Sequence, residues 1–160
     1  MSYADRVTGT KVGFAYEQSG HFDAFARIRR QAERDAAEVR ALVNEHGIRR
    51  AIGFSRGARA VVGALADGPD LFERVALVIP PGGTAAGKYS SWLESLPIAR
   101  PDTLTGEILV IGNRGDQGHP ARVAREWADQ LGAHVGILPS RAVYTDVEPV
   151  ATLLRDFFAS

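Results

Sequence analysis

The sequence feature that most constrains the fold of this chain is the stretch AIGFSRGA at 51–58. In it Ser55 stands between Gly53 and Gly57 in a G-x-S-x-G pattern. The apolar residues before it predict a buried strand, and ARAVVGALA at 58–66 predicts a helix. Where a strand turns sharply into a helix the two backbones approach closely, and a Cβ atom there would collide. We therefore predict that both glycines permit a tight strand–turn–helix unit that exposes the Ser55 hydroxyl at its tip.

Strand and helix patterns alternate along the rest of the chain. Short continuous apolar runs predict strands buried on both faces, and apolar residues spaced three and four apart predict amphipathic helices. The expected strands cover 48–54, 75–79, 108–111 and 134–138, and the expected helices cover about 22–45, 58–66, 120–131 and 146–158. This order indicates an α/β fold, a mostly parallel sheet with flanking helices, in one domain of 160 residues.

The two stretches outside this alternation are assigned less structure. A short strand is expected at 2–7, followed by a loop at 8–20. The long segment at 82–106 contains Trp92 and is interpreted as a reduced cap or lid, because loops of this length inside a compact domain are usually functional. We expect substrate specificity to reside in it.

Composition narrows the function classes. Apolar residues make up 45% of the chain, charged residues 24%, and the formal net charge is zero, as in a soluble globular protein with no nucleic-acid partner. There is no cysteine for a disulfide, a thiol nucleophile or a zinc ribbon. No signal peptide or membrane-spanning run is evident, so we expect a cytoplasmic location and no membrane partner. No metal ion or cofactor is expected.

Ser55 is the leading candidate for chemistry, as a nucleophile that needs a base to take its proton. One alternative is a serine that only caps the following helix. Another is a dinucleotide-binding turn, which Gly53 and Gly57 partly imitate. That turn lacks its third glycine, since Arg59 or Ala60 stands there, and no acid follows the strand at 75–79 to hold a ribose.

A base and an acid are sought on the same rim, because ligands of parallel sheets bind beyond the carboxyl ends of the strands. Asp116, just after the strand at 108–111, is a candidate acid; its alternative is capping of the helix near Pro120. His119 is the candidate base, and its alternative is a loop histidine packed beside Pro120. His46 and His134 are expected at the opposite edge of the sheet, whereas His21 stays possible as a rim residue.

These residues together resemble the carboxyl-terminal part of an α/β-hydrolase. The resemblance is carried by AIGFSRGARAVVGALADGPDLFERVALVIPPGG, ILVIGNRGDQGHPARVA and ILPSRAVYTDVEPVATLLRDFF, and more weakly by YADRVTG near the start. It implies that Ser55 is the nucleophile of a nucleophile elbow, that the Arg56 main-chain N–H stabilises an oxyanion, and that Asp116 is the acid. Substrate-binding positions are then expected at four further residues: Phe54, Pro81, Trp92 and Tyr144.

The chain departs from the family in two ways. Family members usually place their histidine in the loop after the last strand, and the matching stretch here, 140–149, contains none, so the usual triad cannot form. Some members with a similar Asp-x-x-His-Pro turn also lack this late histidine, which leaves His119 as a substitute or a structural residue. The resemblance also implies a truncated member without the amino-terminal strands, and we expect a homodimer or a partner chain to cover the exposed sheet edge.

Three functions follow from these observations. The first is a serine hydrolase-like enzyme that acts on an ester, thioester or lactone of a small molecule through Ser55, Asp116 and His119. The second keeps the fold without hydrolysis, as a cyclase, lyase or isomerase whose pocket uses the elbow turn, Trp92, Tyr144 or Asp146. The third is a catalytically silent partner subunit.

Overall fold

The computed structural model of the chain describes residues 24–81, 104–116, 120–139, 143 and 146–160, and their side chains from residue 30 onward. The elements are α1 (Ala24–His46), β1 (Arg50–Phe54), α2 (Arg56–Asp67), β2 (Arg74–Val78), β3 (Glu107–Asn113), α4 (Ala121–Leu131), β4 (His134–Leu138) and α6 (Val147–Ala159). Every end lies within two residues of the predicted one, so the prediction of these eight elements is confirmed. The strand expected at 2–7, the loop at 8–20 and nearly all of the segment at 82–106 lie outside the described residues.

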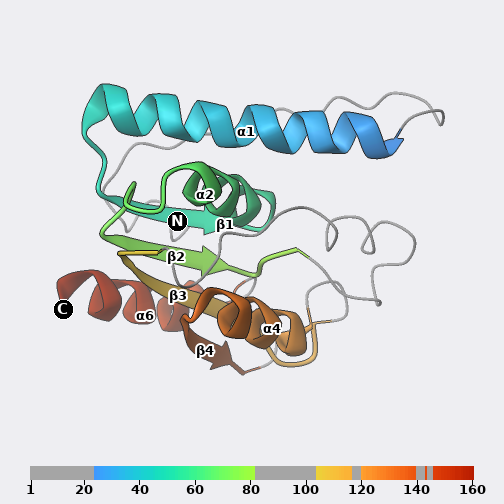
Figure 1. Cartoon of the computed structure of the whole chain (residues 1–160). Helices are drawn as coiled ribbons and strands as arrows, with labels where there is room; N and C mark the ends of the chain where they lie inside the picture. Colours follow the sequence, from blue (N-terminus) through green and yellow to red (C-terminus); the bar gives the residue numbers. More distant parts are fainter. Residues whose placement is uncertain (1–23, 82–103, 117–119, 140–142, 144–145) are drawn as a thin grey trace.

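The strands of the described chain form one four-stranded sheet in the order β1-β2-β3-β4, and all neighbours are parallel (Figure 1). The register pairs Phe54 with Val78 and Val78 with Ile111, so these strands end at one common edge. β2 lies inside the sheet, and Leu77 and Val78 are fully buried. Its continuous apolar sequence follows from helices that cover both faces. The α/β fold with a parallel sheet and flanking helices is confirmed.

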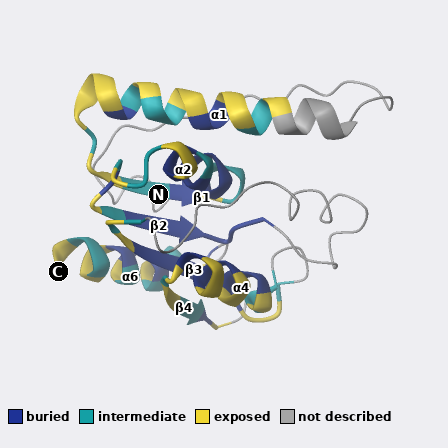
Figure 2. Ribbon diagram, viewed as in Figure 1, coloured by how far each residue is buried: buried dark blue, intermediate teal, exposed yellow. Residues whose placement is uncertain are grey.

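Two apolar cores lie on opposite faces of the sheet. On one face α2 and α4 pack against the strands, with Val62, Leu77 and Trp127 in the core. On the other face α6 covers the sheet, and Ile111, Val150 and Leu154 are buried there. Figure 2 shows the buried residues concentrated in the inner strands β2 and β3 and in the inward sides of these helices. The sheet is therefore the middle layer of a three-layer sandwich.

α1 packs against α2, and its exposed residues lie on the side turned away from that helix (Figure 2). The two helices approach closely at Gly63 of α2, where a Cβ atom would lie 3.0 Å from the Cβ of Ala36. α1 ends at His46, and the next residue, Gly47, has the left-handed φ of 63° that commonly stops a helix. Within the described residues, no helix combines the length and apolar character that crossing a membrane requires.

Candidate active site

Ser55 occupies the turn between β1 and α2 with φ 50° and ψ −113°. A serine rarely adopts a left-handed φ, and such backbone strain costs on the order of 1–3 kcal/mol. Its N–H donates to the Val78 carbonyl at 2.9 Å, and its carbonyl accepts the Ala58 N–H at 3.0 Å. The side chain makes no helix-capping hydrogen bond, so the interpretation of Ser55 as a capping serine is wrong.

The two glycines of the motif differ. A Cβ on Gly53 would lie 2.5 Å from the Ala58 Cα and 2.7 Å from its nitrogen, so the predicted close approach of strand and helix is confirmed there. Gly57 has no such neighbour: within the described residues, nothing beyond its own helix comes within 4 Å of its Cβ position. The prediction for Gly57 is wrong, because the helix residue that lies against the strand is Ala58 and the Cβ position of Gly57 points away from it.

The adjacent strand end is strained in the same way. Of the described residues, only Ser55 and Ile79 combine a positive φ with a side chain, and Ile79 has φ 44°. Ile79 directly follows β2, is 2% exposed, and donates its N–H to the Ile111 carbonyl at 2.7 Å. β-branched residues avoid this conformation even more strongly than serine does. Strand β2 therefore ends one residue earlier than predicted, and the chain leaves the sheet there in a constrained turn.

The part of the predicted rim that the structure describes lies at the carboxyl edge of the sheet. Ser55 comes directly after β1, Pro80 and Pro81 come shortly after β2, and Asp116 comes shortly after β3. Asp116 is half-buried, with its Oδ2 atom fully buried. The ends of β1 and β3 are two strand spacings apart, about 10 Å. Pro120 occupies the N-cap position of α4 and supplies no side-chain capping hydrogen bond, and the choice between acid and helix cap for Asp116 stays a prediction.

The remaining predicted residues fall into three groups. Phe54 ends β1 with 38% of its surface exposed, whereas Pro81 is buried. His46 and His134 lie at the end of α1 and the start of β4, at the opposite edge from Ser55, as predicted. The rest lie outside the described residues: His21, Trp92, His119 and Tyr144.

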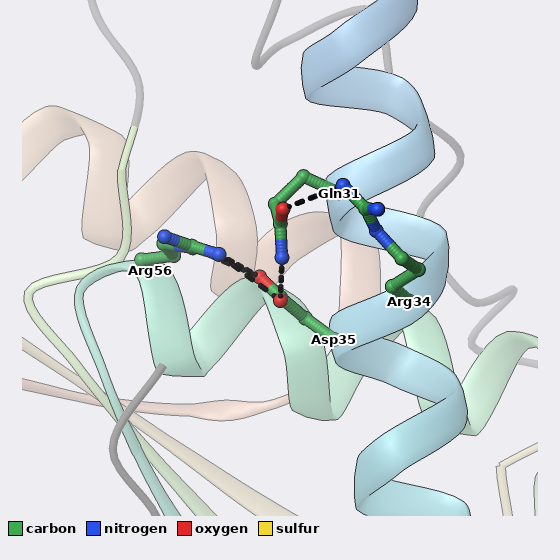
Figure 3. Close-up of polar contacts among 4 residues, drawn as sticks. All are labelled: Gln31, Arg34, Asp35 and Arg56. Carbon is green, nitrogen blue, oxygen red and sulfur yellow. Dashed lines mark hydrogen bonds and ion pairs between the residues drawn. The ribbon is translucent and has the colours of Figure 1, made fainter. Parts of the chain in front are cut away.

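Arg56, the first residue of α2, makes an ion pair that the sequence did not predict (Figure 3). Its guanidinium donates from Nε to Oδ2 and from Nη2 to Oδ1 of Asp35 on α1, at 2.8 and 3.0 Å. Asp35 is only 3% exposed. A signal did exist, because Asp35 stands beside Ala36 and four residues before Val39, inside the apolar stripe of α1. A carboxylate at such a position needs a buried partner.

Two further buried polar residues lie close to the rim in sequence. Asn113, the last residue of β3, is fully buried and its Oδ1 accepts the Val143 N–H at 3.4 Å, which ties β3 to the segment after β4. Arg59 lies one helical turn beyond Ser55 and is 7% exposed. Burial lowers the pKa of its guanidinium to about 10. In the part of the chain that the structure describes, no three His, Asp or Glu residues are grouped as metal ligands are.

Comparison with known proteins identifies the fold. No protein-family model matches the sequence. No curated protein sequence matches it either. Solved structures do match. Esterase RhEst1 from Rhodococcus sp. has a TM-score of 0.62 at 13% identity, and the match covers 92% of this chain and 77% of the esterase chain. The α/β-hydrolase enzyme MGS-MChE2 from a lagoon-sediment metagenome has a TM-score of 0.61 at 16% identity, and the match covers 80% of this chain and 69% of the MGS-MChE2 chain.

A third similar structure is an esterase from Pyrococcus furiosus, with a TM-score of 0.58 at 16% identity. The match covers 81% of this chain but 62% of the esterase, less than two thirds of its length. At these identities the likeness concerns the fold. The chain has the α/β-hydrolase fold, with Ser55 on the turn between the first described strand and the helix that follows it.

Proposed function

We propose that this protein is a serine hydrolase-like enzyme that acts on an ester, thioester or lactone of a small molecule. The observation that carries the proposal is the strained turn at Ser55, with φ 50° between β1 and α2 and no helix-capping bond from the side chain. Strain of this kind persists where the surroundings fix it, and it concentrates at functional sites. A nucleophile elbow uses such a turn to hold a serine hydroxyl clear of the sheet.

In the proposed reaction the Ser55 Oγ attacks the carbonyl carbon of the substrate while a base accepts its proton. The tetrahedral intermediate carries its negative charge on the former carbonyl oxygen, and the Arg56 N–H at the start of α2 donates to it. Collapse expels the alcohol or thiol, which takes the proton back from the base. Water, activated by the same base, then hydrolyses the acyl-serine and regenerates Ser55.

We assign the base to His119 and the acid that orients it to Asp116. Asp116 follows β3, two strands along the sheet from β1, which Ser55 follows, and an imidazole between them would accept the Ser55 proton on one side and donate to the Asp116 carboxylate on the other. The exposed Phe54 side chain and Pro81, with Trp92 and Tyr144, are the proposed substrate contacts. Apolar and aromatic groups of this kind favour a small apolar acyl or alcohol group.

The proposal is tested by hydrolysis of short-chain 4-nitrophenyl esters, a thioester and a lactone. Ser55→Ala is expected to lower kcat/KM by at least about 1,000-fold. Ser160→Ala makes the same side-chain change at the end of the chain, beyond α6, and is expected to leave activity within twofold. Equal activity of Ser55→Ala and wild type on every substrate would refute the role of Ser55.

A second candidate, a cyclase, lyase or isomerase on the same fold, is favoured by one observation. The stretch 140–149, where hydrolases of this fold usually carry their histidine, contains none. A reaction that needs no acyl-serine would use Tyr144 or Asp146 for proton transfer and would survive Ser55→Ala. A catalytically silent subunit would show no turnover in the wild-type protein or in Ser55→Ala.

The homodimer or partner chain remains part of the proposal. Among the described strands β1 stands at one end of the sheet, next to Ser55. A second chain that covers this edge would shield it from unwanted pairing and would complete the site. Light scattering at micromolar concentration is expected to give the mass of a dimer, and a monomer mass would count against a homodimer.

A further inference from the structure

The interface between α1 and α2 contains a polar cluster beside the Ser55 turn. Asp35 accepts two hydrogen bonds from Arg56 and a third from Gln31, whose Nε2 lies 2.7 Å from Oδ1. Gln31 in turn accepts a hydrogen bond from Arg34 at 2.8 Å. Figure 3 shows the order of these contacts, with three residues on α1 and only Arg56 on α2.

The contact between Asp35 and Arg56 is unusually restrictive. A planar guanidinium that donates through two nitrogens to one carboxylate has its orientation fixed as well as its position. The Asp35 side chain is 4% exposed, so water does not replace the bonds it makes. Asp35 also balances the charge of Arg56, so the ion pair has no net charge.

This contact acts on the residue that follows the strained serine. Ser55 is restrained from the sheet side by its hydrogen bond to Val78. Arg56 is restrained from the other side by Asp35, and the peptide that joins Ser55 to Arg56 lies between the two restraints. That peptide carries the N–H proposed as the oxyanion donor, whose direction matters more for the transition state than for substrate binding.

We propose that Asp35, supported by Gln31, is a positioning residue for the Ser55 nucleophile. It fixes the Arg56 side chain and thereby holds the Ser55–Arg56 peptide in the conformation that the reaction requires. This inference rests on the proposed function, because a nucleophile must exist to be positioned. It assigns to α1 a role in the reaction rather than in packing alone.

The same two helices supply a matched control. Arg40 of α1 pairs with Asp67 of α2 at 2.7 Å, the same length as the shortest contact between Arg56 and Asp35. This pair is more exposed, with 30% and 66% of its side chains accessible. Asp67 ends α2, eleven residues beyond Arg56, a separation of about 16 Å along the helix. An ion pair there joins α1 to α2 without reaching the turn.

The experiment compares Asp35→Asn with Asp67→Asn in the full chain, using the best ester substrate. Misplacement of a catalytic group by about 1 Å lowers rates up to about 100-fold, so we expect kcat of Asp35→Asn to fall about 10- to 100-fold. KM is expected to stay within twofold, and Asp67→Asn to keep both constants within twofold. The rate of covalent labelling by a fluorophosphonate is expected to fall in parallel with kcat.

Arg56→Lys provides a second variant in case Asp35→Asn does not fold. It keeps the charge and the main-chain N–H but loses the two-point contact, so kcat is expected to fall with KM preserved. Equal kcat values for Asp35→Asn, Arg56→Lys and Asp67→Asn in an active enzyme would overturn the positioning role alone. A wild-type protein that neither turns over nor is labelled would instead overturn the proposed function, and this inference with it.

Discussion

The two edges of the sheet are held in different ways. At the amino edge, where the strands begin, ion pairs link the starts of neighbouring strands: Arg49 to Glu73, directly before β1 and β2, at 3.3 Å, and Arg74 to Glu107, the first residues of β2 and β3, at 3.1 Å. At the carboxyl edge, the ends of β1 and β2 instead carry the strained residues Ser55 and Ile79. One edge has contacts that favour the folded state, and the other has conformations that cost free energy.

This difference indicates how the chain separates stability from function. Strained conformations persist only where surrounding contacts leave the backbone no alternative. Here those contacts are the two buried cores, the hydrogen bond from Ser55 to Val78 and the ion pair between Arg56 and Asp35. Substitutions at the carboxyl edge should therefore change activity or abolish folding, whereas substitutions at the amino edge should change stability alone.

The largest effect is expected for Gly53→Ala. The new methyl group would meet the Ala58 backbone at 2.5 Å, and neither the strand nor the helix can move away without breaking the turn. We expect the free energy of unfolding to fall by about 3 kcal/mol, measured by urea denaturation.

Gly57→Ala is the matched control for that variant. Its methyl group meets no described atom outside its own helix within 4 Å, and alanine favours a helix over glycine by about 1 kcal/mol. We expect a free energy of unfolding equal to or above that of wild type. If both variants lose the same stability, the distinction between the two glycines is wrong.

A smaller effect is expected for Arg74→Ala at the amino edge. Arg74 donates to the Phe157 carbonyl at 2.6 Å and to the Ser160 hydroxyl at 3.0 Å, so it ties β2 to the end of α6. Loss of these bonds should cost about 1–2 kcal/mol. A Tm lower by roughly 2–8 °C is expected for a chain of this size, with kcat unchanged at 25 °C. A fall in kcat at that temperature would contradict the separation of the two edges.

The smallest effect is expected for Arg49→Ala, the same change at the neighbouring ion pair. The Arg49 side chain is 54% exposed and its partner Glu73 is 59% exposed. Exposed pairs of this kind contribute about 0–1 kcal/mol, so the free energy of unfolding should change by less than about 0.5 kcal/mol. A loss as large as that of Arg74→Ala would show that the amino edge is held by the strand-to-strand pairs rather than by the contact with α6.

The sequence predicts much of this fold because its strongest signals are local. The apolar runs at 75–79 and 108–111 are strands because both faces are covered, and the spacing of Ala36, Val39 and Val43 sets the buried side of α1. The turn at Ser55 was also predictable. A glycine is required at 53 because its backbone lies against Ala58, only five residues further along the chain.

Features that depend on tertiary packing were not predictable in the same way. The pairing of Asp35 with Arg56 requires knowing how α1 lies on α2, although the acid in an apolar stripe was a signal. The left-handed φ of Ile79 arises where the chain must leave a buried strand, and an isoleucine gives no indication of it. The roles of Asp116 and His119 stay predictions, since no local pattern fixes the distance between side chains from different loops.

The Ser55 turn is proposed to present a reactive nucleophile. The most direct measurement is the intact mass of the protein after incubation with a fluorophosphonate, with peptide mapping of the adduct. We expect one covalent adduct on Ser55 in wild type and in Asp67→Asn, slower labelling in Asp35→Asn, and none in Ser55→Ala. A folded wild-type protein that gains no mass, or an adduct that persists in Ser55→Ala, would contradict the account.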